Sequence, residues 1–281
     1  MFYHRSSYES DMSEKPLILV TNDDGIESPG LQAAAEAVSD LGELLIVAPS
    51  SQRTGSGRSY PPVRDKTIYP TEIRLNGRSH PAYKSDVSPA QAVVLAALLL
   101  AERPIDLCVS GINFGENIGS TVTTSGTVGA AMEAASFDIP ALAVSLETPK
   151  EFHVKYSDEI DFAAAARFTG SFARRLLTKG LPPGVDLLKI DVPAEATANT
   201  AWQAGTVARQ RYWHPTLNQP ARPNEQQSIG YQARVDYDRL EPESDIHIFL
   251  IDRLVPVVPM TLDLTAPVDL RVITDFLNGS S

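Results

Sequence analysis

Short apolar runs alternate with longer amphipathic segments along the chain up to about residue 195. Near-continuous apolar runs are typical of strands buried on both faces, and alanine-rich or amphipathic segments of ten or more residues are typical of helices. The predicted strands are 17–22, 43–48, 105–110, 139–145 and 185–191. The predicted helices are 31–41, 90–102, 125–136 and 158–179. Strands joined through helices pair in parallel, so the pattern predicts an α/β fold with a doubly wound sheet covered on both faces.

Local signals support these boundaries. Ser28-Pro29 and Ser88-Pro89 each combine an N-cap residue with a proline in the first helical turn. Gly42 is placed to end the first helix. The segment 62–84 carries β-branched and aromatic residues between turn residues, which predicts short antiparallel strands or a hairpin.

The pattern changes after about residue 195. Segments 202–212 and 226–237 have β character and flank a Pro- and Asn-rich turn, so we expect a long hairpin that projects from the core. Residues 246–251 alternate weakly and predict an edge strand, and 268–277 form a short amphipathic tail. The predicted organisation is a flexible tail over 1–16, a core over 17–195, and a hairpin and C-terminal arm over 196–281.

Composition narrows the class of protein. The chain has 281 residues and a formal net charge of −11, which argues against binding of a nucleic-acid duplex because that needs a basic face. Cys108 is the single cysteine and lies in an apolar run, so we expect an inert core residue. The first residues lack a signal-peptide core, and no stretch is apolar for long enough to span a membrane, so we expect a cytoplasmic protein.

Two adjacent carboxylates follow the first predicted strand, in Asn22-Asp23-Asp24-Gly25. The carboxyl ends of strands are where open α/β sheets bind ligands. Neighbouring acids at a strand end repel each other and lose hydration unless a positive group lies between them. A divalent cation is the simplest such group, although an acidic turn that caps a helix is a common alternative.

Two further connections place polar residues at strand ends, namely 50–57 and 110–117. Loops from neighbouring parallel strands can meet at one point, since the strands lie about 4.8 Å apart. Carboxylate, hydroxyl and amide oxygens suit Mg²⁺, Mn²⁺ or Ca²⁺. Taken alone, each of these connections is equally compatible with a solvated loop.

The start of the predicted helix at Ser125-Gly126-Thr127 has the composition of an anion site. Free N–H groups and the helix dipole favour an anion there, and glycine allows close approach of the backbone. Simple helix capping is the alternative. A metal beside such a helix start would suit phosphate ester chemistry.

These segments, in this order and spacing, closely resemble the SurE family of stationary-phase survival proteins. The resemblance covers about residues 17–145. The matching segments are Val20-Thr21-Asn22-Asp23-Asp24-Gly25-Ile26, Ala48-Pro49 with Gln52-Arg53, Ser110-Gly111-Ile112-Asn113 with Gly115, Asn117 and Gly119, Ser125-Gly126-Thr127-Val128, and Ile139-Pro140 through Ser145.

The resemblance implies a Rossmann-like three-layer core, one divalent metal cation, and hydrolysis of nucleoside 5′- and often 3′-monophosphates. It also implies a homodimer or homotetramer formed through the projecting hairpin and the C-terminal arm. Carried over by position, the implied metal ligands are Asp23, Asp24, Thr54 and Asn113.

The chain departs from the family pattern at three places. Thr54 replaces the usual serine, Val87-Ser88-Pro89-Ala90-Gln91 replaces Gly-Thr-Pro-Ala-Asp, and Thr124 stands where tyrosine or histidine is usual. The threonine keeps a hydroxyl but adds a methyl group that restricts χ1.

The resulting hypothesis is a 5′-nucleotidase in which metal-activated water attacks phosphorus in line. Asp23, Asp24 and Asn113 are its expected catalytic residues. The expected phosphate-binding residues are Asn22, Asn117, Ser125, Gly126 and Thr127, of which Asn22 and Asn117 also orient neighbouring groups. One alternative is a nucleotide-binding regulator of the same fold with lost turnover, motivated by the three departures. A dinucleotide-dependent oxidoreductase is disfavoured, because two acids stand where a pyrophosphate needs glycine.

Overall fold

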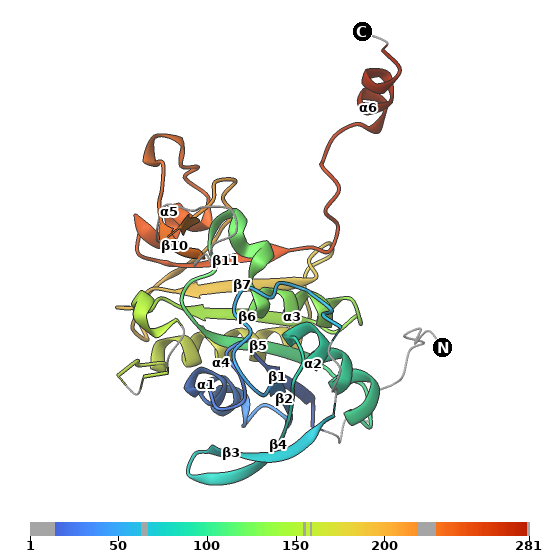
Figure 1. The fold of residues 1–281 in the computed structure, drawn as a ribbon, viewed down its shortest axis with the longest axis vertical. Helices are drawn as coiled ribbons and strands as arrows, with labels where there is room; N and C mark the ends of the chain where they lie inside the picture. The colour runs from blue at the N-terminus through green and yellow to red at the C-terminus, as the bar shows by residue number, and fades with distance from the viewer. Residues whose placement is uncertain (1–14, 63–66, 154–155, 158, 218–228, 280–281) are drawn as a thin grey trace, which may run out of the picture.

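A nine-stranded sheet forms the centre of the molecule in the computed structural model, which describes residues 15–62, 67–153, 156–157, 159–217 and 229–279 (Figure 1). The strand order is β3-β4-β2-β1-β5-β6-β7-β11-β8, and β9 and β10 form a separate two-stranded sheet. The strands are β1 Leu17–Thr21, β2 Glu43–Pro49, β3 Tyr69–Leu75, β4 Arg78–Ser85, β5 Leu107–Phe114, β6 Ala141–Leu146, β7 Leu187–Val192, β8 Trp202–Ala204, β9 Trp213–Leu217, β10 Ile229–Ala233 and β11 Val255–Met260.

Helices cover both faces of this sheet, which confirms the predicted doubly wound, mostly parallel α/β fold. The α-helices are α1 Pro29–Val38, α2 Pro89–Leu95, α3 Gly126–Ala135, α4 Ala163–Lys179, α5 Asp245–Leu250 and α6 Leu270–Leu277. Shorter helical segments are the π-helix η1 Ala96–Leu100 and the 3₁₀ helices η2 Gly119–Thr124, η3 Lys150–Phe152 and η4 Tyr237–Arg239.

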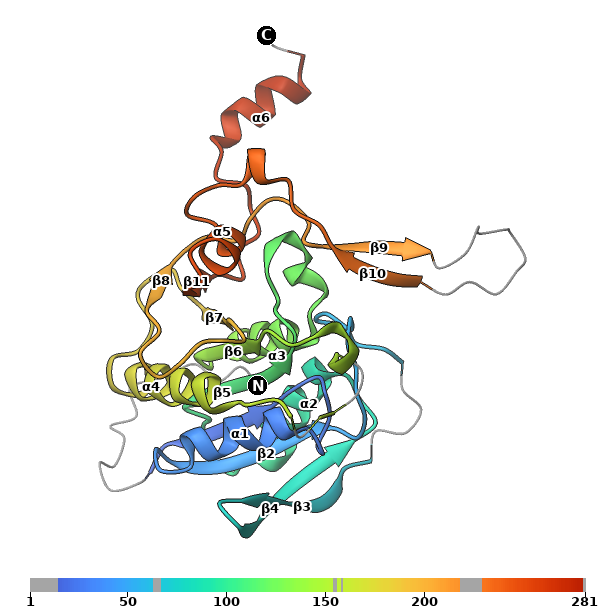
Figure 2. The same cartoon turned by 90° about the vertical axis from the view of Figure 1, so that its left-hand side faces the viewer.

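Two apolar cores lie on opposite faces of the sheet. One is formed with α1 and α4, and the other with α2 and α3 (Figures 1 and 2). All residues of β1, β5 and β6 are buried, as expected for central parallel strands. Cys108 packs within the second core, and burial raises the pKa of its thiol to about 12, consistent with an inert residue.

Four sequence-based expectations need correction. Residues 246–251 are predicted as an edge strand but belong mainly to α5, where the Ser244 hydroxyl caps the helix by accepting from His247 N. β5 continues to Phe114, so Asn113 lies in a strand rather than a loop. The segment 202–212 supplies β8 to the main sheet and is no arm of the hairpin. The long helix begins at Ala163 rather than at 158, a position that lies outside the described residues.

The residues after 195 both rejoin the core and extend from it. β11 pairs antiparallel with β7 and parallel with β8, and so extends the main sheet. The β9–β10 pair projects sideways, and α6 stands apart from the body of the molecule (Figure 2). The expected tail 1–16 lies outside the described residues except for its last two positions, as does most of the expected hairpin turn. The division at residue 195 stays a prediction.

Candidate active site

The connections that follow β1, β2 and β5 meet at the carboxyl edge of the sheet, because β1 lies between β2 and β5. Arg53 N donates to the Asp23 main-chain oxygen at 2.6 Å. Gln52 Nε2 donates to Asp24 Oδ1 at 3.0 Å, and Phe114 N donates to Asp24 Oδ2 at 3.2 Å. The structure therefore brings together three segments that the sequence only predicts to be neighbours.

Asp23 is buried against the start of α3. Thr127 Oγ1 donates to Asp23 Oδ1 at 2.5 Å. A Cβ atom on Gly126 would lie 2.6 Å from Asp23 Cβ and 2.7 Å from Ser56 Oγ, so glycine is required for this close approach. Burial raises the pKa of Asp23, although hydrogen bonds from Thr127 and from the helix start oppose the rise.

Asp24 is also buried, and its surroundings disfavour the charged carboxylate even more strongly than those of Asp23 do. Burial raises the pKa of Asp24 well above its usual value, and the charge of Asp23 raises it further. Of the ion pairs between described residues, none involves either acid, and the nearby Arg53 pairs with Asp86 instead. Two adjacent buried carboxylates that lack a neighbouring cation strongly favour the binding of a positively charged ligand.

The Asn22 side chain shapes the turn that carries both acids. Asn22 Nδ2 donates to Gly25 O at 3.1 Å, and Gly25 N donates to Asn22 Oδ1 at 3.0 Å. Gly25 has a φ of +105°, a backbone conformation that a residue with a side chain adopts only with strain. Asn22 therefore fixes the turn and uses its amide group to do so.

Asn113, near the end of β5, and Asn117, in the connection after it, point to different partners. Asn113 Nδ2 donates to Gly115 O at 2.6 Å, which leaves Oδ1 without a hydrogen-bond donor among the described residues. A register shift between Ser110 and Asn113 in the β5–β6 pairing places this residue. Asn117 Nδ2 donates to Ser145 Oγ at 2.9 Å, so its amide nitrogen is directed at β6.

The connection that follows β2, the second of the three, is hydrogen-bonded to the region of α3 on one side and to α2 on the other. Gly57 N donates to Thr124 O at 2.9 Å, and Arg58 Nε donates to Glu133 Oε2 at 2.6 Å. Ser88 Oγ donates to Ser59 O at 2.6 Å. These contacts hold Ser56 beside Asp23, where its hydroxyl is buried and has no hydrogen-bond partner among the described residues. Thr54, two residues earlier, is exposed.

A third side of the site is formed by the segment after β6, which the sequence-based expectations omit. Tyr156 OH donates to the Asp24 main-chain oxygen at 2.5 Å, and Gln52 Nε2 donates to His153 O at 2.6 Å. His153 Nε2 lies 3.1 Å from Thr148 O, and its Nδ1 lies 3.1 Å from Tyr231 OH on β10. Burial lowers the pKa of His153, which favours the neutral ring that donates to Thr148 and accepts from Tyr231.

Comparison with known proteins decides the family. A family model described as survival protein SurE matches residues 18–215. The chain belongs to the SurE family.

Relatives and one solved structure extend the match to nearly the whole chain. A protein of Thermococcus gammatolerans named 5′-nucleotidase SurE is 39% identical over 94% of this chain and 97% of that protein. A protein of the same name from Methanocella arvoryzae is 39% identical over 89% of this chain and 93% of that protein. The crystal structure of SurE protein from Aquifex aeolicus matches with a TM-score of 0.71 and 26% identity, over 94% of this chain and 100% of that chain.

At one of its three departures from the SurE pattern, the chain uses the substituted residues structurally. Ser88 and Gln91 form a reciprocal capping box at the start of α2. Gln91 Nε2 also donates to Pro61 O at 3.2 Å. The substituted pair thus anchors the end of the second connection. Thr124, at another departure, donates its hydroxyl to Thr121 O at 2.8 Å and is exposed.

The donor set of the site fits a hard divalent cation. Within the described ranges, no group of three or more His, Cys, Asp or Glu side chains is gathered for a metal. A cation at Asp23 and Asp24 would therefore rely on neutral oxygens as well, and Asn113 Oδ1 and the unpartnered Ser56 Oγ are such atoms. Oxygen-only donor sets are typical of Mg²⁺, Mn²⁺ and Ca²⁺ sites.

No helix among the described residues combines the length and apolar character needed to cross a bilayer.

Proposed function

We propose that this chain is a metal-dependent 5′-nucleotidase that releases phosphate from nucleoside 5′-monophosphates, with 3′-monophosphates as a second substrate class to be tested in the same assay. The observation that carries the proposal is the pair of buried, adjacent carboxylates of Asp23 and Asp24, which have raised pKa values and, among the described residues, no cationic side chain beside them. The names of the SurE relatives support the substrate class.

Asp23, Asp24 and Asn113 would hold the cation, together with a hydroxyl of the second connection. Thr54 is the hydroxyl that the family pattern implies, and Ser56 is the one whose Oγ lies buried near Asp23. Such a cation, when bound, polarises a phosphoryl oxygen and lowers the pKa of water. Thr127 holds the Asp23 carboxylate through its hydroxyl, and Gln52 holds Asp24.

The start of α3 supports phosphate binding at the same place. Ser125 caps this helix by accepting from Val128 N at 3.2 Å, which leaves the hydrogen of its hydroxyl able to donate to a phosphate oxygen. We therefore assign the contribution of Ser125 to its hydroxyl and that of the helix start to the helix dipole, since the backbone N–H groups of Gly126 and Thr127 donate to Asp23. Asn22 and Asn117 contribute by fixing the turn and the connection on either side.

The Asp23→Asn variant tests the proposal. It keeps the shape of the side chain and removes its charge, so we expect phosphate release from AMP or GMP with Mn²⁺ or Mg²⁺ to fall by at least about 100-fold. Asp40→Asn, an exposed acid on the α1 side, is the matched control and should retain activity. Undiminished hydrolysis by Asp23→Asn would show that the site is wrongly assigned.

The same assay decides between an enzyme and a nucleotide-binding regulator. The regulator would bind AMP tightly and release no phosphate with any divalent cation, with or without a chelator. The exposed Thr54 and the altered residues around Ser88 motivate this second candidate.

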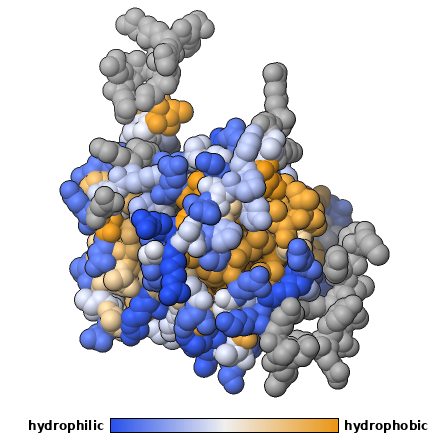
Figure 3. Space-filling view, turned by 90° about the horizontal axis from the view of Figure 1, so that it is seen from below, coloured by the Kyte–Doolittle hydropathy of each residue, from blue (hydrophilic) through white to orange (hydrophobic). Residues whose placement is uncertain are grey.

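Self-association is a further part of the proposal. α6 carries exposed Leu270, Ile273, Phe276 and Leu277 on a helix that stands apart from the body. Figure 3 shows, in addition, a broad apolar area bordered by hydrophilic residues on the face seen from below. Exposed apolar surface of this kind favours a homodimer or homotetramer.

A further inference from the structure

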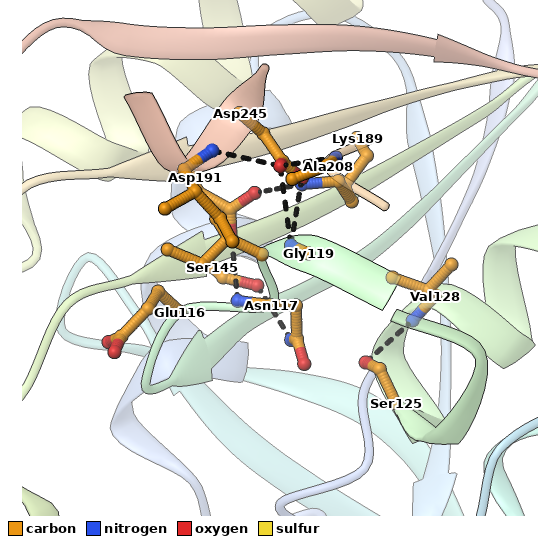
Figure 4. A network of polar contacts seen from close by, with 12 residues as sticks. Glu116, Asn117, Gly119, Ser125, Val128, Ser145, Lys189, Asp191, Ala208 and Asp245 are labelled. Atoms are coloured by element: carbon orange, nitrogen blue, oxygen red, sulfur yellow. Dashed lines mark hydrogen bonds and ion pairs between the residues drawn. The ribbon is translucent and has the colours of Figure 1, made fainter. Parts of the chain in front are cut away.

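Lys189 is a charged residue with no exposed surface, in the middle of β7. Its Nζ lies 2.5 Å from Asp191 Oδ2 and 3.1 Å from Asp245 Oδ2 (Figure 4). Burial alone would lower the pKa of Lys189, but the two facing carboxylates outweigh burial and raise it. The two carboxylates therefore favour the charged form of Lys189.

The two carboxylates extend this ion cluster to the connection between β5 and α3. Asp191 Oδ1 accepts from Asn117 N at 2.7 Å. Asp245 accepts from Gly119 N at 3.2 Å through Oδ2 and from Ala208 N at 2.9 Å through Oδ1. Two backbone N–H groups of the connection thus end on carboxylates that Lys189 holds in place.

This connection begins and ends at the proposed active site. At its start, Gly115 O accepts from the Asn113 side chain, which orients the amide of that residue. Beyond Gly119, η2 leads directly to Ser125, which caps α3 beside Asp23. A shift of residues 115–119 would therefore move Asn113 and the start of α3 together.

We propose that Lys189 is a positioning residue of the nucleotidase, which fixes the Asn113 amide and the start of α3 through Asp191, Asp245 and the backbone of residues 115–119. The inference rests on the proposed function. Lys189 touches neither substrate nor metal ligand, and it acts by charge balance. One lysine against two carboxylates gives the cluster a formal net charge of −1, and backbone N–H groups donate to both carboxylates. Without the cation, two buried carboxylates repel each other and lose their partner.

Lys189→Met and the double variant Lys189→Met with Asp191→Asn test this charge balance. The single variant leaves the cluster at −2, whereas the double variant restores −1 and keeps an oxygen that accepts from Asn117 N. For the single variant we expect kcat for AMP hydrolysis to fall by about 10- to 100-fold, with a smaller change in KM. Amide hydrogen exchange over residues 113–119 should accelerate. The double variant should recover most of kcat and slow exchange.

Lys179→Met, at an exposed lysine that ends α4, is the matched control and should behave as the parent protein. If Lys189→Met does not fold, Ser145→Ala, which removes the partner of the Asn117 amide, should still accelerate exchange over 113–119. Unchanged exchange in the folded single variant, or a double variant that folds but recovers neither kcat nor slow exchange, overturns the inference. Hydrogen exchange needs no substrate, so an inactive parent protein would contradict the proposed function without deciding this inference.

Discussion

Two pairs of buried acids differ in how their charge is balanced: Asp23 and Asp24 follow β1, whereas Asp191 lies in β7 and Asp245 at the start of α5. Asp191 and Asp245 face Lys189, and each also accepts hydrogen bonds from backbone N–H groups. Asp23 and Asp24 have hydrogen bonds but no cationic side chain beside them among the described residues. Burial raises the pKa of Asp23, of Asp24 and of Asp191, but only at Asp191 does a neighbouring lysine oppose that rise.

The difference separates a structural acid pair from one prepared for a ligand. A buried charge that the protein itself neutralises contributes to a defined arrangement of the chain. A buried pair that the protein leaves without a cation is unfavourable until something positive binds, and perturbed carboxyls in such a setting are characteristic of functional sites. The same residue type thus has two roles, and the partner decides which.

Of the variants that test this comparison, Asp245→Asn is expected to have the largest effect on stability. The amide nitrogen in place of Oδ2 would face Lys189 Nζ and Gly119 N, both of which are donors. We expect a loss of about 3 kcal/mol in the free energy of unfolding, measured by urea denaturation. Asp23→Asn should lose less than about 1 kcal/mol, since it removes repulsion within an unneutralised pair. Equal losses in the two variants would erase the distinction between the pairs.

The sequence shows the unneutralised pair more readily than the neutralised one. Asp23 and Asp24 stand at the end of an apolar strand, where local pattern alone marks them. Lys189 interrupts an apolar strand and is visible as an oddity, but its partner Asp245 is distant in the chain and becomes its neighbour only through the pairing of the last strands. The network of Lys189 is therefore absent from the sequence-based expectations.

Elements and site contacts divide in the same way. The parallel strands and their helices are predictable because buried strands require apolar runs. Residues 246–251 are misread because a short apolar run has no decisive period, although Ser244 supplies an N-cap signal. Gln52 and His153 belong to the site through a contact 101 residues apart in the chain, for which sequence offers no local sign.

A further buried acid, Glu116, provides the next test, and its effect depends on pH. Burial, followed by the charges of Glu147 and Asp191, raises its pKa to about 7, against a hydrogen bond from Tyr212 that lowers it. The unfolded chain releases this proton near its ordinary value of 4.5. The contribution of Glu116 to stability is therefore present below about pH 4.5 and is lost as pH rises through about 7.

Glu116→Gln should remove this pH dependence, because the amide does not titrate and its oxygen can still accept from Tyr212. Above pH 7 we expect the variant to exceed the parent protein in unfolding free energy by about 1–3 kcal/mol, with a difference that shrinks toward pH 5. Glu102→Gln, at an exposed glutamate, is the control. If the unfolding free energies of the parent protein and the variant change in parallel from pH 5 to pH 8, Glu116 belongs with the neutralised acids.

The smallest expected effect is on cation binding, and it concerns the hydroxyl that lies beside Asp23 and Asp24. In the Lys189 cluster, Asp191 and Asp245 are held by several donors, whereas beside Asp23 the buried Ser56 Oγ has no partner among the described residues. If Ser56 contributes to the cation site, Ser56→Ala should weaken Mn²⁺ binding by about 10-fold, measured by calorimetry without nucleotide. Thr54→Ala is the matched comparison. Loss of affinity in Thr54→Ala alone would return the role to the residue that the family pattern implies, and would leave the Ser56 hydroxyl as a consequence of how closely Gly126 approaches Asp23.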